Sequence, residues 1–171
     1  MEPRVLDLQQ ILQKLVGLHR QLLETIRLER EALANADVRR IQETTHAKEA
    51  IVESIQTRER ERLALMAQFA TTKQADGSRR TLQEIILEIQ GSDAKAAESL
   101  RTAQMTLKLL LQRIIDANAE NGELVKRSLL HLDQMKRNVL GAQPATPETY
   151  GPGGRRVPQS VQGSRLISKE V

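Results

Sequence analysis

Apolar residues return at alternating intervals of three and four in the first part of the chain, which is the spacing of one face of an α-helix. This face consists of Val5, Leu8, Leu12, Leu15, Leu22, Ile26 and Leu33, with His19 at one of its positions. A second line flanks it, made of Ile11, Val16, Leu18 and Leu23. The stripe is wider than a two-stranded coiled coil needs, so it predicts a bundle helix with two neighbours or a partner. Pro3 suits the first turn of this helix, which should end near Ala34.

The segment Asn35-Ala36-Asp37 interrupts the apolar spacing. Asp37 can accept hydrogen bonds from the first free N–H groups of a second helix. That helix carries Val38, Ile41, Val52, Ile55, Leu63, Met66 and Phe69. Such a short link makes the two helices antiparallel neighbours. Thr45, Lys48 and Glu59 lie near the apolar face, so the middle of the second helix is expected to be less buried than its ends.

A turn signal, Asp76-Gly77-Ser78, lies in a polar segment that runs from residue 72 to residue 80. Thr81 and Glu84 then match a capping box, in which each side chain bonds the other residue's backbone N–H. A short apolar helix follows, with Leu82, Ile85, Ile86 and Ile89. Gly91 is expected to end it, using its freedom to take a positive φ, and Ser92 or Asp93 should start the next helix.

The last predicted helix is long, from about Asp93 to Leu140. One face consists of Leu100, Ala103, Leu107, Leu110, Ile114, Ala117, Asn121, Leu124, Ser128, Leu132, Met135 and Val139. A second line, Leu111, Ile115, Val125 and Leu129, widens it. Gly122 lies inside this helix, where glycine costs about 1 kcal/mol relative to alanine. We therefore expect a kink or a frayed point there.

The composition changes after Leu140. Four of the five prolines and five of the nine glycines lie in residues 141–171. Such a segment buries too little apolar surface to offset the entropy of ordering it. The sequence therefore predicts an all-α protein with two parts. Residues 1–140 form an antiparallel bundle of three long helices and one short helix, and residues 141–171 form a disordered Pro/Gly-rich tail.

Charge and composition exclude several classes of function. The net charge is +4, and half of it lies after Gly141, where four basic and two acidic residues occur. Without a basic stripe, and with only Phe69 and Tyr150 as aromatic residues, nucleic-acid binding is not expected. The chain has no cysteine, which excludes disulfides and thiol catalysis.

The start of the chain and the distribution of apolar residues indicate the cellular compartment. Glu2, Arg4 and Asp7 precede the first apolar residues, unlike the start of a signal peptide. No run of about 18 uncharged apolar residues indicates a membrane-spanning helix. We therefore expect a cytoplasmic protein that does not insert into a membrane.

Few residues suggest catalysis or metal binding. Glu43 and His46 have the Glu-x-x-His spacing of di-metal bundles, but such a site needs a second pair, and neither His19 nor His131 completes one. His19 is better explained as a hydrogen-bonded core histidine or an edge residue. The glycines near Gly151 do not lie between a strand and a helix, as a phosphate loop would. We therefore expect no enzyme activity, no cofactor and no metal.

The apolar surface of the first and last helices exceeds what the polar second helix obviously covers. One bundle could bury all of it, or the same stripe could pair with a second copy of the chain. Alternatively, a helix from a partner protein covers the surplus by helix-in-groove recognition.

The chain resembles the FlgN family of flagellar export chaperones over nearly its whole length. The first two helices contribute Leu22, Leu23, Glu29, Leu33, Asp37, Ile41, Lys48, Ile55, Arg58 and Leu63 to this resemblance. The last helix contributes Asn118-Ala119-Glu120-Asn121, Leu124, Ser128 and Leu129. The tail segment 149–154 is similar to a Tyr-Gly-x-x-Gly element of these proteins. Gly122-Glu123 departs from the family pattern, in which helix formers are more usual.

The resemblance implies a cytoplasmic chaperone for flagellar hook-associated proteins. Its clients would be the hook–filament junction proteins of the FlgK and FlgL type. It would hold their C-terminal helical segments, prevent premature self-association and deliver them to the flagellar type III export gate. Chaperoning of another flagellar client such as flagellin, or a general coiled-coil adaptor role, remain alternatives.

Two sets of candidate site residues follow. The candidate client-binding residues are Leu124, Val125, Leu129, Leu132, Met135 and Val139, of which Val125, Leu129 and Leu132 are expected to be available to the client. The candidate residues for docking on the export gate are Tyr150, Arg155 and Arg156, because an aromatic residue in a flexible segment can anchor a short recognition motif.

Overall fold

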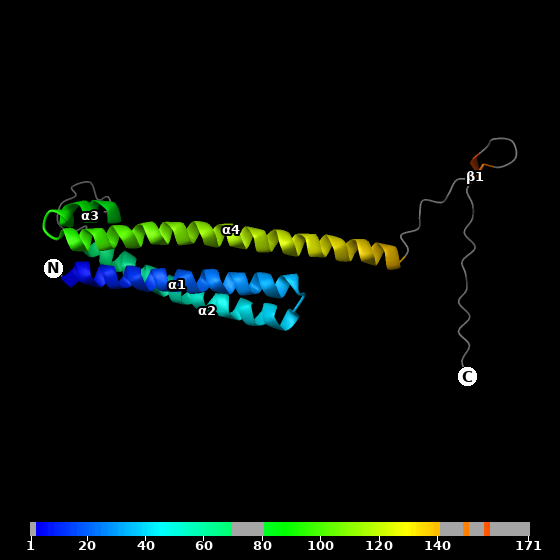
Figure 1. Ribbon diagram of the computed structural model, residues 1–171, viewed down its shortest axis with the longest axis horizontal. Coiled ribbons are helices and arrows are strands. Elements are labelled where there is room, and N and C mark those ends of the chain that lie inside the picture. The colour runs from blue at the N-terminus through cyan, green and yellow to red at the C-terminus, as the bar shows by residue number, and fades with distance from the viewer. Residues whose placement is uncertain (1–2, 70–80, 141–148, 151–155, 158–171) are drawn as a thin grey trace. The chain divides into compact units, whose positions relative to one another are not determined.

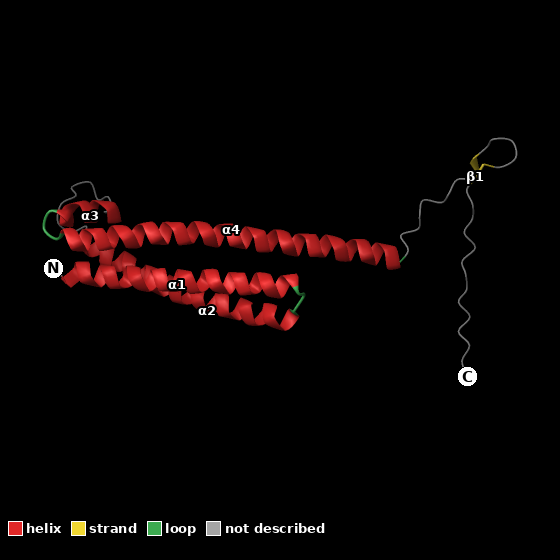
Figure 2. Ribbon diagram, in the orientation of Figure 1, coloured by secondary structure: helices red, strands yellow, loops and turns green. Residues whose placement is uncertain are grey.

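The structure is a computed structural model that describes residues 3–69, 81–140, 149–150 and 156–157. It contains helices α1 (Pro3–Ala34), α2 (Val38–Phe69), α3 (Leu82–Gln90) and α4 (Ala94–Val139), and strands β1 (Thr149–Tyr150) and β2 (Arg156–Val157). Figure 2 shows the three long helices and the short one in red. The predicted all-α class and the predicted set of helices are therefore confirmed.

Helix α1 supplies most of the core. Its buried apolar residues are Val5, Leu8, Leu12, Leu15, Leu22, Leu23, Ile26 and Ala32. All but Ala32 belong to the predicted face or its flanking line, whereas Leu33 of that face is only half-buried. Helix α2 runs antiparallel beside it (Figure 1), as the short link requires. The link turns at Ala36, which has a φ of 51°. Asp37 then caps α2, because its Oδ1 accepts a hydrogen bond from Arg40 N at 3.1 Å.

Helix α4 runs parallel to α1 along its first part. Gln9 donates to the carbonyl of Ala96 at 3.3 Å, and Asn121 donates to the carbonyl of Ile26 at 3.0 Å, so residue numbers rise together on both helices. Two apolar clusters fill the bundle. One lies around Leu8, Phe69 and Ile85, and the other joins Leu22, Leu23 and Ile26 to Leu110 and Ile114.

Side-chain caps mark the starts of α3 and α4. Thr81 and Glu84 form the predicted capping box, with Glu84 N bonded to Thr81 Oγ1 and Thr81 N bonded to Glu84 Oε2. Asp93 starts α4 by accepting from Ala96 N at 2.9 Å. The expected positive φ at Gly91 is wrong: its φ is −74°, because the chain ends α3 with a helical turn in which Ser92 N and Asp93 N both bond the carbonyl of Ile89.

Helix α2 is buried less evenly than expected. Its middle is poorly buried, as predicted, but its N-terminal end is not buried either, since Val38 is 65% exposed. Leu65, Met66 and Phe69 at the C-terminal end are its only buried residues. They lie in the cluster that includes α3 residues Ile85 and Ile86, so α3 adds apolar cover only at that end.

Helix α4 is assigned as helix without interruption through Gly122. The kink or frayed point expected at Gly122 therefore does not interrupt the helix. Apart from Gly122, its two chain neighbours and the nearby backbone of α4, no described atom lies within 4 Å of the position that a Cβ on Gly122 would occupy. A side chain larger than that of glycine would therefore fit at this position of α4.

The chain divides into two compact units, residues 1–127 and 128–171. The predicted domain boundary after Leu140 stays a prediction. Most of the tail that we expected to be disordered lies outside the described residues. Within the described part, β1 and β2 pair antiparallel, with Thr149 opposite Val157 and Tyr150 opposite Arg156.

Candidate partner-binding surface

The C-terminal part of α4 presents an apolar face to solvent. Leu129 is 61% exposed, Leu132 60% and Val139 81%. Val125 and Met135 are also exposed, and Leu124 is half-buried. We refer to the residues Leu124, Val125, Leu129, Leu132, Met135 and Val139 as the terminal stripe.

The terminal stripe continues the face of α4 that is buried earlier in the helix. Leu100, Leu110, Ile114 and Asn121 are buried, and steps of three and four residues lead from Asn121 through Leu124 or Val125 to Leu132 and Val139. The sequence therefore repeats a core pattern over a segment in which no described residue from Val125 onward is buried. An amphipathic helix with this pattern is built to pack against another helix.

The structure places the predicted client-binding residues together on one helix face. Val125, Leu129 and Leu132, the three expected to be available, are all exposed. Leu124 is the least exposed member of the set. Whether these residues bind a client stays a prediction.

A buried polar cluster lies where α4 is still covered, and the sequence did not predict it. Asn121 of α4 is 5% exposed and donates to Glu29 Oε2 of α1 at 3.0 Å. Lys48 of α2 donates to Glu29 Oε1. Beside the cluster, Arg30 pairs with Glu120. The cluster ties all three long helices together through one carboxylate.

Two features of the sequence indicated Asn121 and Lys48 as residues that need polar partners, but they did not show that both bond Glu29. Asn121 stands at an apolar position of the last helix, and Lys48 stands near the apolar face of the second helix. A polar residue on an apolar face needs a hydrogen-bonding partner. The partner, Glu29, could not be chosen from the helical spacing of either helix alone.

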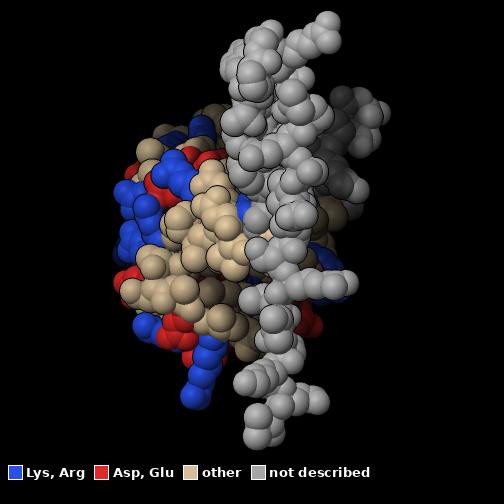
Figure 3. All heavy atoms as spheres, turned by 90° about the vertical axis from the view of Figure 1, so that its right-hand side faces the viewer, with Lys and Arg blue, Asp and Glu red and all other residues tan. Residues whose placement is uncertain are grey.

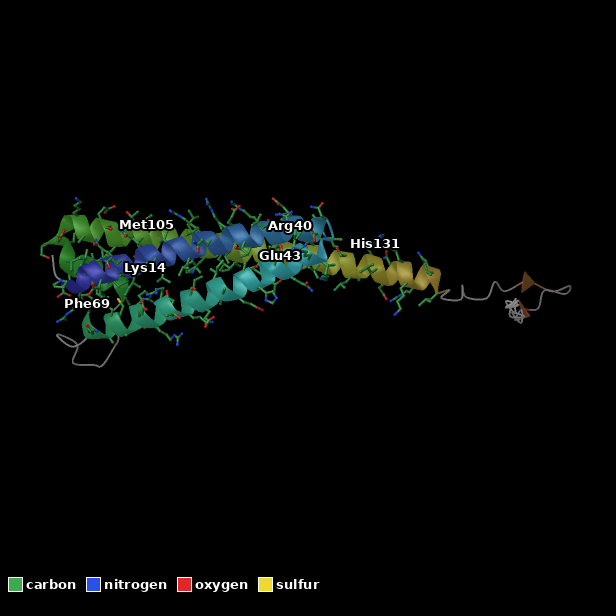
Figure 4. All side chains as sticks on the ribbon, turned by 90° about the horizontal axis from the view of Figure 1, so that it is seen from below. Lys14, Arg40, Glu43, Phe69, Met105 and His131 are labelled. Carbon is green, nitrogen blue, oxygen red and sulfur yellow. The ribbon has the colours of Figure 1, made fainter. Side chains whose placement is uncertain are left out.

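The three histidines lie on three different helices. His19 is buried, and its Nδ1 lies 2.7 Å from the carbonyl oxygen of Leu15, so it is the hydrogen-bonded core histidine of the two expected alternatives. His46 lies 3.4 Å from Glu49 on the exposed face of α2. Figure 4 labels Glu43 on α2 and His131 on α4. Over the part of the chain that the structure describes, no group of three potential ligands could hold a metal ion.

A cavity of about 530 Å³ opens between α1 and α4. It is lined by Gln13, Val16, Gly17, Arg20, Lys95, Glu98, Ser99, Thr102, Ala103 and Thr106. Its only carboxylate, Glu98, forms an ion pair with Arg101 at 3.0 Å. The lining has no histidine and no second carboxylate.

The described surface mixes charges of both signs. Lys and Arg side chains lie among Asp and Glu side chains on the face seen in Figure 3. Several ion pairs join residues three or four positions apart on one helix, such as Arg58 with Glu61 and Arg137 with Asp133. The expectation that the chain does not bind nucleic acid stays a prediction.

The predicted gate-docking residues lie at the edge of what the structure describes. Tyr150 ends β1 and Arg156 begins β2, and these two residues are paired in the strand register. Arg155 lies outside the described residues. No described helix combines the length and the apolar character needed to cross a bilayer.

The comparisons with known proteins give one match. The family model described as "FlgN protein" matches residues 1–158, a span that includes the four helices and the start of the tail. No curated protein and no solved structure matches the chain. Because the family model covers well over half of the sequence, the chain belongs to the FlgN family.

Proposed function

We propose that this protein acts in the cytoplasm as an export chaperone for hook–filament junction proteins of the FlgK and FlgL type. Membership in the FlgN family indicates a flagellar export chaperone. The clients and the delivery step are our proposal. The chaperone holds the C-terminal helical segments of its clients, keeps them from associating too early and brings them to the export gate.

The observation that carries this proposal is the exposure of the terminal stripe. A client segment that will form a helical assembly outside the cell is amphipathic and tends to self-associate inside it. A second amphipathic helix can cover the apolar side of that segment reversibly. The terminal stripe supplies such a helix, with four of its residues, Leu129, Leu132, Met135 and Val139, at least half exposed.

The bundle supports this role by holding the first part of α4 firmly. Leu100 is fully buried and Asn121 is bonded to two groups of α1. The helix is therefore already formed before a client arrives, so little of the binding free energy is spent on folding it. Preorganisation of this kind suits a chaperone that must bind and release.

We further propose that the tail docks the loaded chaperone on the export gate. Tyr150 would provide the anchor, since a single buried aromatic side chain can dominate a small interface. Arg155 and Arg156 would steer the tail toward an acidic surface. This division assigns client binding to α4 and docking to residues after Leu140.

Capture from the native cytoplasm tests the client assignment. The tagged chain should retain hook-associated proteins, identified by mass spectrometry. Deleting the C-terminal helical segment of a retained client should abolish its capture, whereas deleting an equal length from its N-terminus should not. Retention of flagellin alone would replace this client with another, and retention of no flagellar protein would overturn the proposed function.

A further inference from the structure

Lys136 lies on the same side of α4 as the terminal stripe. It follows Leu132 by four residues and precedes Val139 by three, and residues at these separations are neighbours on a helix surface. Leu132 and Val139 are both exposed. A partner helix that covers the stripe would therefore also cover or border the Lys136 ammonium group.

No acidic residue of this part of the helix is available to Lys136. Asp133 is the nearest acid by helical spacing, and its carboxylate already pairs with Arg137 at 2.7 Å. Within the described residues, Lys136 has no ion pair. The two basic residues of the last turn of α4 therefore differ: Arg137 is neutralised by its own helix, and Lys136 is not.

Covering an unpaired ammonium group with an apolar surface costs free energy, because the charge loses water without gaining a partner. The flexible stem of lysine can lie along apolar side chains and bring its charge to the edge of an interface. A carboxylate at that edge on the partner would compensate the charge. A cation there would repel it.

We infer that the terminal stripe selects an amphipathic helix that carries acidic residues beside its apolar face, and that Lys136 determines this selectivity. The inference rests on the proposed function, since it assumes that a client helix covers the stripe. It adds the charge of the client segment, which the family membership and the apolar pattern leave open.

Two synthetic helical peptides provide the probe. Both carry the same leucine stripe, and the flanking positions on each side of it are glutamate in one peptide and lysine in the other. Each is titrated by calorimetry into the full-length chain at concentrations where sedimentation shows both partners to be monomeric. The glutamate peptide should bind about three- to tenfold more tightly than the lysine peptide at low salt, and the difference should shrink as salt is added.

Variants of α4 separate Lys136 from the overall charge of the protein. Lys136→Gln should remove most of the preference for the glutamate peptide. Arg127→Gln, the matched control, removes the same charge from the opposite side of the same helix and should leave the preference largely intact. Lys136→Glu should reverse the preference toward the lysine peptide.

The outcomes distinguish this inference from the proposed function. Equal binding of both peptides, or equal effects of Lys136→Gln and Arg127→Gln, would overturn the role of Lys136 but would not contradict the terminal stripe as the docking surface. If Leu129→Glu plus Leu132→Glu leaves peptide binding unchanged, the stripe is not the docking surface and both proposals fail. Both also fail if neither peptide binds, including the case in which the chain self-associates through the stripe.

Discussion

The Asn121 side-chain amide on α4 donates to the Glu29 carboxylate on α1 at 3.0 Å, across 92 positions of sequence. The same amide group also donates to the backbone carbonyl of Ile26. Both residues are buried, so this bond is shielded from solvent. Together with Lys48 it fixes how far α4 is shifted along α1, because an apolar contact could slide by a turn and this pairing could not.

Replacing Asn121 with leucine should destabilise the bundle by about 1–3 kcal/mol, since Glu29 would lose the buried one of its two hydrogen-bonding partners. Urea unfolding followed by circular dichroism measures the effect. Asn118→Leu is the matched control, because Asn118 is exposed and lies three residues earlier in the same helix. Equal stability of the two variants would show that the buried bond contributes little.

Leu15→Asp should unfold the helical domain. Leu15 is fully buried, and an unpaired carboxylate in such a position costs several kcal/mol, comparable with the stability of a small domain. The helical circular dichroism signal should be lost at room temperature. Leu6→Asp serves as the control on the same helix, because Leu6 is 44% exposed. A variant at Leu15 that melts like the unmodified protein would mean that α1 is not in the core.

Leu129→Glu combined with Leu132→Glu should abolish binding of the client's C-terminal segment and leave the fold largely intact. Both side chains are exposed, so the bundle does not depend on them, whereas an apolar interface cannot accommodate two carboxylates. Binding is measured by calorimetry and the fold by thermal melting. Met105→Glu combined with Leu109→Glu is the control, since these exposed residues lie on α4 outside the terminal stripe. Wild-type affinity in the stripe variant would exclude this surface.

A chain that ends at Leu140 should fold and bind its client normally but support export poorly. Tyr150→Ala alone should reproduce much of that loss, if one aromatic side chain dominates the docking contact. Secreted client is quantified in culture supernatants beside the amount of cytoplasmic complex. Wild-type secretion by the Tyr150→Ala strain would remove this residue as the anchor. Loss of client binding in the shortened chain would instead assign the tail to the client site.

Gly122→Ala should stabilise the protein by about 0.5–1 kcal/mol. The residue is helical and exposed, and an added Cβ meets no atom within 4 Å. Alanine loses less conformational entropy than glycine on folding into a helix. Thermal melting should show a modest rise in Tm. A fall in Tm would indicate that glycine serves a local geometry that alanine cannot adopt.

Much of the fold could be predicted because its determinants are local. Asp37, Thr81 and Asp93 mark helix starts through hydrogen bonds to residues only three positions away. The apolar spacing of α1 gave its buried face for the same reason. Gly91 was predicted wrongly because glycine permits a positive φ without requiring it.

The site was harder to predict than the fold. The apolar spacing of α4 is the same in its buried and its exposed parts. The sequence alone therefore could not show at which residue the other helices stop burying this face. Burial of Leu110 and exposure of Leu132 depend on the positions of other helices. The bond between Glu29 and Asn121 likewise joins residues that only the tertiary structure brings together. Such distant pairings leave no periodic signal in a single sequence.

The uneven burial of α2 has a consequence for how the bundle opens. Its buried residues all lie in its last five positions, whereas α1 has buried residues along its whole length. Elements with few buried apolar contacts open locally at a lower free-energy cost than the rest of the protein. The backbone amides in the first two thirds of α2 should therefore exchange with deuterium well before those of α1. Helix α1 would then stay folded while the N-terminal part of α2 opens and closes locally beside it.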